Sequence, residues 1–273
     1  MHSAKIMSLL RRHNIHPAKS LGQNFLVDEA VYDDILEASN VEALDVVLEV
    51  GPGIGVLTKR LAAKVRCVVA VELDRKMISV LRDVLDRDDP VHIVQGDILE
   101  VDPVAEIAEA LDRPEVNDLE YKVVANPPYY ITSALIRHLL TARVRPTQVT
   151  MMVQEEVAER IVAEPGDLSL LAVSVQYFGE PELVRRVPAN AFYPSPDVNS
   201  AILNIGVHED REKSEKEREV FFRTARAGFA HKRKQIHNSL THNLRVPHER
   251  VLEVLKDANV DSKRRPQTLT IQE

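Results

Sequence analysis

The stretch from Asp45 to Gly55 (DVVLEVGPGIG) constrains this chain more than any other part of its sequence. Its first half is an apolar, valine-rich run with the length of a buried strand. Gly51 and Gly53 follow at once, and the apolar residues after Gly55 recur at helical spacing. The stretch therefore predicts a strand, a glycine turn and a helix, the first half of a nucleotide-binding βαβ unit. Glycine suits such a turn because it adopts positive φ freely and keeps no side chain between ligand and backbone.

The spacing of the glycines narrows the choice of ligand. The pattern is E-x-G-x-G-x-G, led by Glu49. It does not fit the dinucleotide fingerprint G-x-G-x-x-G, because the third glycine would fall at Val56, and it does not fit a phosphate-binding P-loop, because no G-K-S/T follows. A second predicted strand ends in Glu72, whose carboxylate can hydrogen-bond both hydroxyls of a ribose, and a third ends in Gly96 and Asp97. A site that binds adenosine but has no pyrophosphate-binding motif indicates S-adenosylmethionine as the ligand. The alternative, glycines that merely shape a turn, is weakened by acidic residues at two successive strand ends.

Composition excludes several classes of protein. The chain has 273 residues, of which 44% are hydrophobic, so it can bury a large core in one domain or one plus a small one. Its single cysteine, Cys67, excludes a disulfide framework and a cysteine-based zinc site, and a cytoplasmic setting is expected. The net charge of −7 argues against a globally basic nucleic-acid binder, although a local basic patch can still bind RNA. Neither a membrane span nor a secretory signal is expected.

A fourth predicted strand, 122–125, ends in the tetrapeptide Asn126-Pro127-Pro128-Tyr129. Ligands bind at the carboxyl ends of strands in open α/β sheets, and successive prolines stiffen this turn. The Asn126 side-chain oxygen and the Pro127 carbonyl can accept both N–H groups of an exocyclic amine and stabilise positive charge as its nitrogen attacks a methyl group. Tyr129 can stack on a base taken out of its own stack. The alternative is a proline turn that only ends a strand.

The N-terminal residues are harder to interpret. Residues 1–19 carry basic but no acidic side chains, so they form either a basic arm that contacts phosphate or a solvated, partly disordered end. Residues 20–26 read as a loop. A helix is predicted at 28–38, with Asp28 as its N-cap.

The C-terminal part of the sequence is helical by pattern and carries a basic cluster. Among residues 222–250 there are many lysines and arginines, and Glu249 is the only acidic residue. A basic face on a net acidic chain is the electrostatic footprint of an RNA-binding surface. We therefore predict that Lys232, Arg233 and Lys234 bind RNA; the alternative is a solvated, charged helix.

The motifs resemble those of amino-directed adenine methyltransferases, and further stretches narrow the resemblance to the ribosomal RNA adenine N6-dimethyltransferases, in particular the bacterial small-subunit enzymes. These stretches are QNFL at 23–26, QEEVAER at 154–160, SVQY at 174–177 and FYPSPDVNSA at 192–201, so the resemblance covers nearly the whole chain. It implies that Asn126, Pro127 and Tyr129 act on the target base. The S-adenosylmethionine-binding residues that it implies are Asn24, Leu26, Gly51, Gly53, Glu72, Asp97 and Asn126.

The resemblance also implies the fold. We expect a Rossmann-like class I S-adenosylmethionine-dependent methyltransferase domain (α/β, with a seven-stranded, mostly parallel sheet) at residues 1–207. A small all-helical, RNA-binding domain is expected at 208–273. Further strands are predicted at 148–153, 170–178 and 201–207, the last two forming an antiparallel edge.

The implied reaction transfers methyl groups to N6 of two adjacent adenosines in a hairpin loop near the 3′ end of 16S rRNA, within the small ribosomal subunit. No metal is required, because the sulfonium of the cofactor supplies the electrophile. A monomer without membrane attachment is expected. Two alternatives are a 23S rRNA adenine N6-methyltransferase that confers macrolide resistance, which shares every catalytic motif, and a non-catalytic RNA-binding assembly factor. Intact Glu72, Asp97 and N-P-P-Y argue against loss of chemistry.

Overall fold

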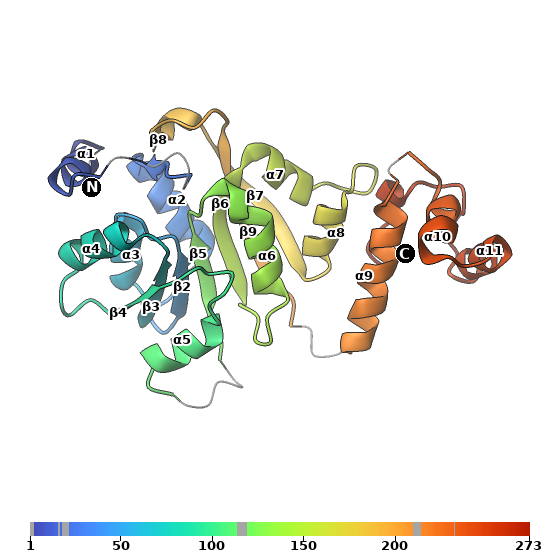
Figure 1. Cartoon of the computed structure of the whole chain (residues 1–273), viewed down its shortest axis with the longest axis horizontal. Coiled ribbons are helices and arrows are strands. Elements are labelled where there is room, and N and C mark those ends of the chain that lie inside the picture. The colour runs from blue at the N-terminus through green and yellow to red at the C-terminus, as the bar shows by residue number, and fades with distance from the viewer. Residues whose placement is uncertain (1–2, 16, 18–21, 114–118, 210–213, 232) are drawn as a thin grey trace. The chain divides into compact units, whose positions relative to one another are not determined.

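A computed structural model gives the structure of the chain (Figure 1). The described residues form two compact units, one made of residues 1–158 and 182–207 and the other of residues 159–181 and 208–273. The predicted domains, 1–207 and 208–273, have the same border after residue 207 as these two units. They differ from the units because the prediction assigned residues 159–181 to the first domain. The structure describes residues 3–15, 17, 22–113, 119–209, 214–231 and 233–273, without the side chains of 3–5.

A mixed seven-stranded sheet dominates the first unit, as predicted. The strand order is β4-β3-β2-β5-β6-β9-β7. Neighbours from β4 to β6 are parallel, whereas β9 runs antiparallel to β6. The strands are β2 (Val46–Val50), β3 (Cys67–Glu72), β4 (Val91–Gln95), β5 (Lys122–Ala125), β6 (Gln148–Gln154), β7 (Gly179–Val187) and β9 (Ser200–Val207).

The strand predicted at 170–178 is wrong. Residues Leu170–Gln176 form helix α8, whose N-cap Ser169 accepts a hydrogen bond from the Ala172 N–H at 3.2 Å. The seventh strand is instead β7, directly after it. A short apolar run does not distinguish a strand from a buried helix, and the charged residues of β7 hide its periodicity.

Helices connect the strands of the sheet. The helix predicted at 28–38 is confirmed as α2, and Asp28 caps it by accepting the Ala30 N–H at 3.0 Å. No helix within the described ranges has the length and apolar composition that crossing a membrane requires. The helices of this unit are α1 (Ser3–Arg12), α2 (Glu29–Ser39), α3 (Val56–Ala62), α4 (Arg75–Val84), α5 (Pro103–Ala110) and α6 (Thr132–Leu140), while α7 (Glu155–Ile161) crosses the border at residue 158.

Helix α1 belongs to the core rather than to a solvated end. Its side chains Ile6 and Leu10 are 0% and 2% exposed and pack in one cluster with Phe25. Arg12 also forms an ion pair with Asp83 of α4 at 3.0 Å. The prediction of a solvated, partly disordered end is therefore wrong for residues 3–12, because the apolar positions of this basic stretch share one helical face.

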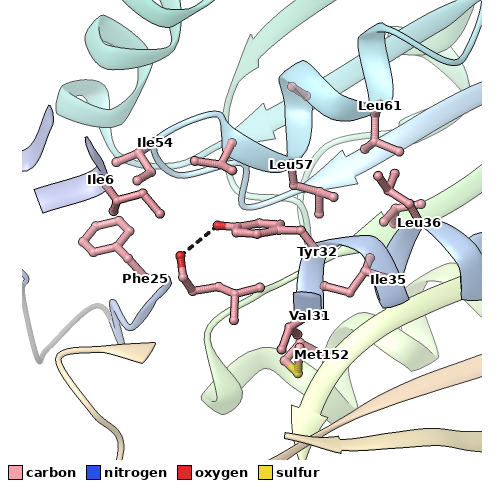
Figure 2. Close-up of a cluster of buried hydrophobic side chains, with 14 of the residues drawn as sticks. Ile6, Phe25, Val31, Tyr32, Ile35, Leu36, Ile54, Leu57, Leu61 and Met152 are labelled. Carbon is pink, nitrogen blue, oxygen red and sulfur yellow. Dashed lines mark hydrogen bonds between the residues drawn. The ribbon is translucent and has the colours of Figure 1, made fainter. Parts of the chain in front are cut away.

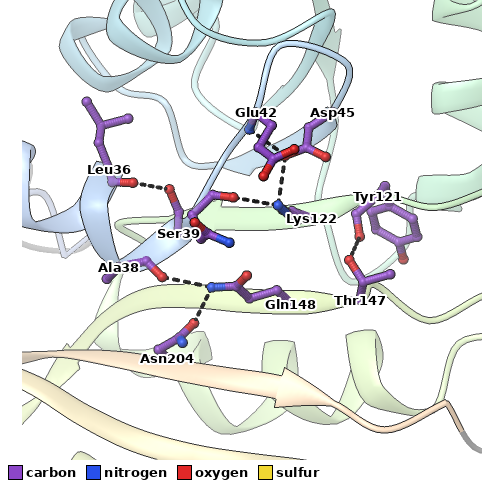
Figure 3. A network of polar contacts seen from close by, with 11 residues as sticks. Leu36, Ala38, Ser39, Glu42, Asp45, Tyr121, Lys122, Thr147, Gln148 and Asn204 are labelled. Atoms are coloured by element: carbon purple, nitrogen blue, oxygen red, sulfur yellow. Dashed lines mark hydrogen bonds and ion pairs between the residues drawn. The ribbon is translucent and has the colours of Figure 1, made fainter.

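Two networks fix α2 against the sheet. On its apolar face, Tyr32 lies in the core between Phe25 and Leu57 (Figure 2). At its carboxyl end, the Nζ of Lys122, the first residue of β5, donates to the Asn40 carbonyl at 2.6 Å and to Asp45 at 2.8 Å (Figure 3). These polar contacts lie at the amino ends of β2 and β5, opposite the carboxyl ends of the strands.

Helices make up most of the second unit. Its helix α9 begins at a capping box formed by Ser214 and Glu217. Aromatic packing joins α9 to the residues after α8: the Tyr177 and Phe221 rings stack with centroids 4.2 Å apart. The three C-terminal helices are α9 (Glu215–Phe229), α10 (Ile236–Leu244) and α11 (His248–Asp257), and α10 contacts both neighbours (Figure 1).

Candidate functional site

The candidate site lies at the carboxyl edge of the sheet. The chain builds β2, β3 and β4 outward in one direction and then returns to place β5 on the other side of β2. Such a reversal opens a crevice at the strand ends, which is where ligands bind in open α/β sheets. A cavity of about 480 Å³ occupies this position. The predicted site residues that line it are Asn24, Leu26, Gly51, Gly53, Glu72, Asn126, Pro127 and Tyr129.

The glycine turn after β2 requires glycine at two positions for different reasons. Gly53 has φ of 55°, a left-handed conformation that strains other residues, and its N–H donates to Glu72 Oε2 at 3.1 Å. Gly55 has φ of 78°, and a Cβ there would lie 2.9 Å from the Cδ2 of Leu81. Gly53 thus leaves the backbone accessible at the cavity, and Gly55 allows the start of α3 to pack against α4.

Glu72 is held in place by the backbone around it. Its Oε1 accepts the Asp74 N–H at 2.8 Å, while Oε2 accepts the Gly53 N–H. The side chain is 8% exposed, and this burial raises its pKa, against the opposing effect of the two amide hydrogen bonds. A carboxylate has about four lone-pair sites, so acceptor capacity remains for a ligand.

Asp97 is not among the described residues that line the cavity. Its Oδ1 accepts the Leu99 N–H at 2.9 Å, while Gln95, at the end of β4, lines the cavity. A role for Asp97 in cofactor binding stays a prediction.

The N-P-P-Y turn forms another part of the cavity lining. Gly51 lies beside this turn, and its φ of 68° is a left-handed conformation that strains other residues, although a Cβ there would be at an ordinary contact distance of 3.8 Å from the Asn126 carbonyl oxygen. The Tyr129 ring is half-buried, and its hydroxyl is hydrogen-bonded to the hydroxyl of Ser200. Burial raises the pKa of Tyr129, so the phenol is neutral at physiological pH. The next residue, Tyr130, is 65% exposed and also lines the cavity.

Some cavity residues escaped the sequence reasoning. Tyr32 donates from its hydroxyl to the Leu26 carbonyl at 2.9 Å, as Figure 2 shows, and so fixes one predicted cofactor residue. Gln23 donates to Asp74 at 3.0 Å and links the QNFL stretch to the end of β3. An aromatic on a predicted helix reads as ordinary core, so only the QNFL resemblance pointed to this region.

Glu49 provides a pH-dependent prediction. This glutamate of β2 is 1% exposed, and among the described residues its Oε2 has no hydrogen-bond partner. Burial raises its pKa from 4.5 to about 8, against the opposing effect of the nearby Thr58 hydroxyl and with a smaller contribution from the Glu72 charge. The folded chain therefore keeps a proton that the unfolded chain releases between pH 4.5 and 8, and stability falls as pH rises through this window.

Glu49→Gln should remove this pH dependence, because glutamine mimics the protonated carboxyl. The free energy of unfolding of the parent should fall relative to that of the variant by about 1.4 kcal/mol for each pH unit in the window. Urea unfolding of both proteins from pH 5 to pH 8 measures this difference. Parallel pH profiles would show that Glu49 is ionised in the folded chain.

Comparison with known proteins identifies the family. Residues 14–273 match the family described as ribosomal RNA adenine dimethylase. The chain belongs to this family. A protein from Pelotomaculum thermopropionicum is 42% identical over 274 residues, which cover 99% of this chain and 93% of that protein. A protein from Moorella thermoacetica is 41% identical over 271 residues, which cover 98% and 94%. Both are named ribosomal RNA small subunit methyltransferase A.

Solved structures support the fold. The 23S rRNA methyltransferase ErmE has a TM-score of 0.72 and 28% identity, over 91% of this chain and 96% of that one. A dimethyladenosine transferase from Plasmodium falciparum has a TM-score of 0.75 and 24% identity, over 90% and 93%. The chain has the class I S-adenosylmethionine-dependent methyltransferase fold and is a ribosomal RNA adenine dimethyltransferase. The 23S alternative is disfavoured, because the small-subunit relatives share 41–42% identity with this chain and ErmE shares 28%.

Proposed function

We propose that this enzyme transfers methyl groups from S-adenosylmethionine to N6 of two adjacent adenosines in a hairpin loop near the 3′ end of 16S rRNA, within the small ribosomal subunit. The observation that carries the proposal is a single cavity lined both by Glu72 and by the N-P-P-Y turn. Such a cavity can bring a methyl donor and a target base together. The relatives named for the small subunit support this choice of substrate.

The donor set around the cavity fits S-adenosylmethionine. Glu72 offers the lone pairs that ribose hydroxyls need, and Gly51 and Gly53, which have no side chains, leave the backbone accessible beside it. Asn24 and Leu26, from the segment before α2, also line the cavity and would contact the cofactor there. When bound, the cofactor supplies an electrophilic methyl group on its sulfonium sulfur.

The N-P-P-Y turn supplies the rest of the chemistry. The N6 lone pair of adenine is delocalised into the ring, so the nitrogen needs help to become a nucleophile. The Asn126 side-chain oxygen and the Pro127 carbonyl accept its N–H groups. Attack of the nitrogen on the methyl carbon would break the carbon–sulfur bond of the bound cofactor, and the two acceptors would stabilise the positive charge on nitrogen. The nitrogen then loses a proton to water, and a second transfer repeats the step. Catalysis is positioning plus electrostatic stabilisation.

The direct test is a methyl-transfer assay on small ribosomal subunits that lack this modification. Nucleoside analysis of the product should show N6-dimethyladenosine, with large subunits as the comparison. Methylation of large subunits alone would overturn the proposed substrate.

RNA docking is proposed for the helical unit. Arg233 and Lys234 are exposed just before α10, whereas Lys232 lies outside the described residues. Replacing Lys232, Arg233 and Lys234 by glutamate should weaken binding to the small subunit. The logarithmic salt slope should flatten by about two units if three phosphate contacts are lost. A salt titration of binding measures both effects, and cofactor affinity should not change because the cavity residues are all in the first unit.

A matched variant controls for net charge. Lys64, Arg66 and Arg113 are exposed cations of the first unit that do not line the cavity, and replacing all three by glutamate makes the same charge change. Equal losses in both triple variants would mean a global charge effect. Parent-like binding by the first variant would exclude the cluster, and the basic residues at Lys5 to Lys19 would become the next candidate.

We infer that the enzyme acts as a monomer in the cytoplasm, where ribosomal subunits are assembled. Sedimentation of the purified chain tests the first inference.

A further inference from the structure

The hydrogen bond between Tyr129 and Ser200 joins residues 71 positions apart in the sequence. Ser200 is the first residue of β9 and is 0% exposed. Because β9 runs antiparallel to β6, with Ser200 opposite Gln154, this serine lies at the carboxyl end of β6, on the edge that carries the cavity. A fully buried hydroxyl needs a partner, and the structure gives it the phenol of the N-P-P-Y turn.

The backbone holds Ser200 rigidly. Immediately before it, the Asn199 carbonyl accepts the Glu155 N–H at 3.1 Å, and the Asn199 side chain accepts the Ala189 N–H at 3.2 Å. Upstream, the two-residue strand β8 (Phe192–Tyr193) pairs with β1 (Phe25–Leu26), which lines the cavity. The segment that presents Ser200 is therefore anchored both to the sheet and to the cavity lining.

Tyr129, by contrast, begins a single turn of 3-10 helix, Tyr129–Ile131. That turn is closed locally by the Ile131 N–H, which donates to the Pro128 carbonyl at 3.2 Å. Local hydrogen bonds fix the backbone of this turn and do not act on the ring. The bond from its hydroxyl to Ser200 does act on the ring.

We propose that Ser200 is a positioning residue for methyl transfer: it holds the Tyr129 phenol so that the ring face is presented to the flipped target base. The role of the Tyr129 ring rests on the proposed function, whereas its contact with Ser200 rests on the structure alone. A small misplacement of a stacked reactant lowers the reaction rate strongly. Loss of the Ser200 hydroxyl should therefore lower turnover and leave cofactor binding unchanged.

A double-mutant cycle tests the proposal. Ser200→Ala and Tyr129→Phe each remove one partner of the bond and should each lower kcat on small subunits, by about tenfold. The double variant should be no slower than the slower single variant, because the bond is lost only once. KM for S-adenosylmethionine should stay within about twofold of the parent value.

The control is Thr150→Val. Thr150 is another fully buried hydroxyl of the same sheet, bonded to Asn204 at 3.0 Å, and neither residue lines the cavity. This variant should lose stability and keep the parent kcat. Multiplicative losses in the double variant, or parent-like turnover by Ser200→Ala, would overturn the proposal. If Ser200→Ala fails to fold, Ser200→Thr and Ser200→Val decide the case, because the two side chains have similar volumes and only threonine keeps the hydroxyl. Turnover should be faster in Ser200→Thr, and equal turnover in the two variants would overturn the proposal.

A second measurement separates the contact from the reaction. The hydroxyl proton of Tyr129 should exchange slowly with solvent in the parent, as seen by NMR of ¹³C-labelled tyrosine, and rapidly in Ser200→Ala. A parent that shows this protection but methylates no small subunits would contradict the proposed function and leave the contact standing. Rapid exchange in the parent would refute the contact itself.

Discussion

Asn126→Ala is expected to lower the methyl-transfer rate by about 10²–10³-fold, the loss typical when one preorganised charge-stabilising group is removed. The amide lines the cavity, and its oxygen is one of the two acceptors proposed for N6. The pre-proline position restricts its backbone, so the acceptor is already oriented before substrate binds. Single-turnover rates at saturating cofactor and RNA isolate this effect from binding.

Asn204→Ala is the matched control for this experiment. Asn204 is half-buried like Asn126, but it lies within β9, where its Oδ1 accepts hydrogen bonds from Gln148 at 2.8 Å and Thr150 at 3.0 Å. Its loss should cost stability without slowing the chemical step. Near-normal turnover by a folded Asn126→Ala protein would exclude the asparagine from the reaction.

Glu72→Ala should weaken S-adenosylmethionine binding by about 1.5–3 kcal/mol, which is roughly ten- to 150-fold in Kd. Charge-assisted hydrogen bonds to hydroxyl groups are the stronger kind, and this carboxylate is nearly buried, where water competes little. Calorimetry on the purified protein measures the change, with circular dichroism to verify the fold.

Glu72→Ala alone does not isolate the contact with the ribose, because Glu72 has structural partners as well. Glu72 also accepts the N–H groups of Gly53 and Asp74, so its removal loosens the turn as well as the ribose contact. An analogue of the cofactor without ribose hydroxyls separates the two contributions. The parent should prefer the natural cofactor over this analogue, and the variant should lose most of that preference. Equal preference in both proteins would place the ribose elsewhere.

Local sequence was sufficient for the framework of the site. Valine-rich β2 and the glycines after it specify a strand and a turn by side-chain volume and allowed φ alone, and the structure confirms both. The rigid turn that begins at Asn126 is equally local, because prolines restrict it wherever the chain folds. Family membership followed from short motifs of this kind, and the comparison with known proteins confirmed it.

Other features depended on contacts between distant segments. Residues 170–176 are helical because Ser169 caps them and α9 contacts them, which apolar periodicity does not encode. Ile6 is buried because a cluster including Phe25 and Ile54 receives it. Gln95, the last residue of β4, lines the cavity and Asp97 does not, a difference that the residue types alone do not predict.

The bond between Tyr129 and Ser200 is the clearest case. Nothing within a few residues of either one predicts it, since each reads locally as an ordinary turn or strand residue. It exists because β9 is inserted beside β6, which brings its first residue to the edge where β5 ends. The sequence by itself determined which chemical groups are present and how stiff their own turns are. Tertiary structure decided which of those groups meet, because that depends on the order of strands in the sheet.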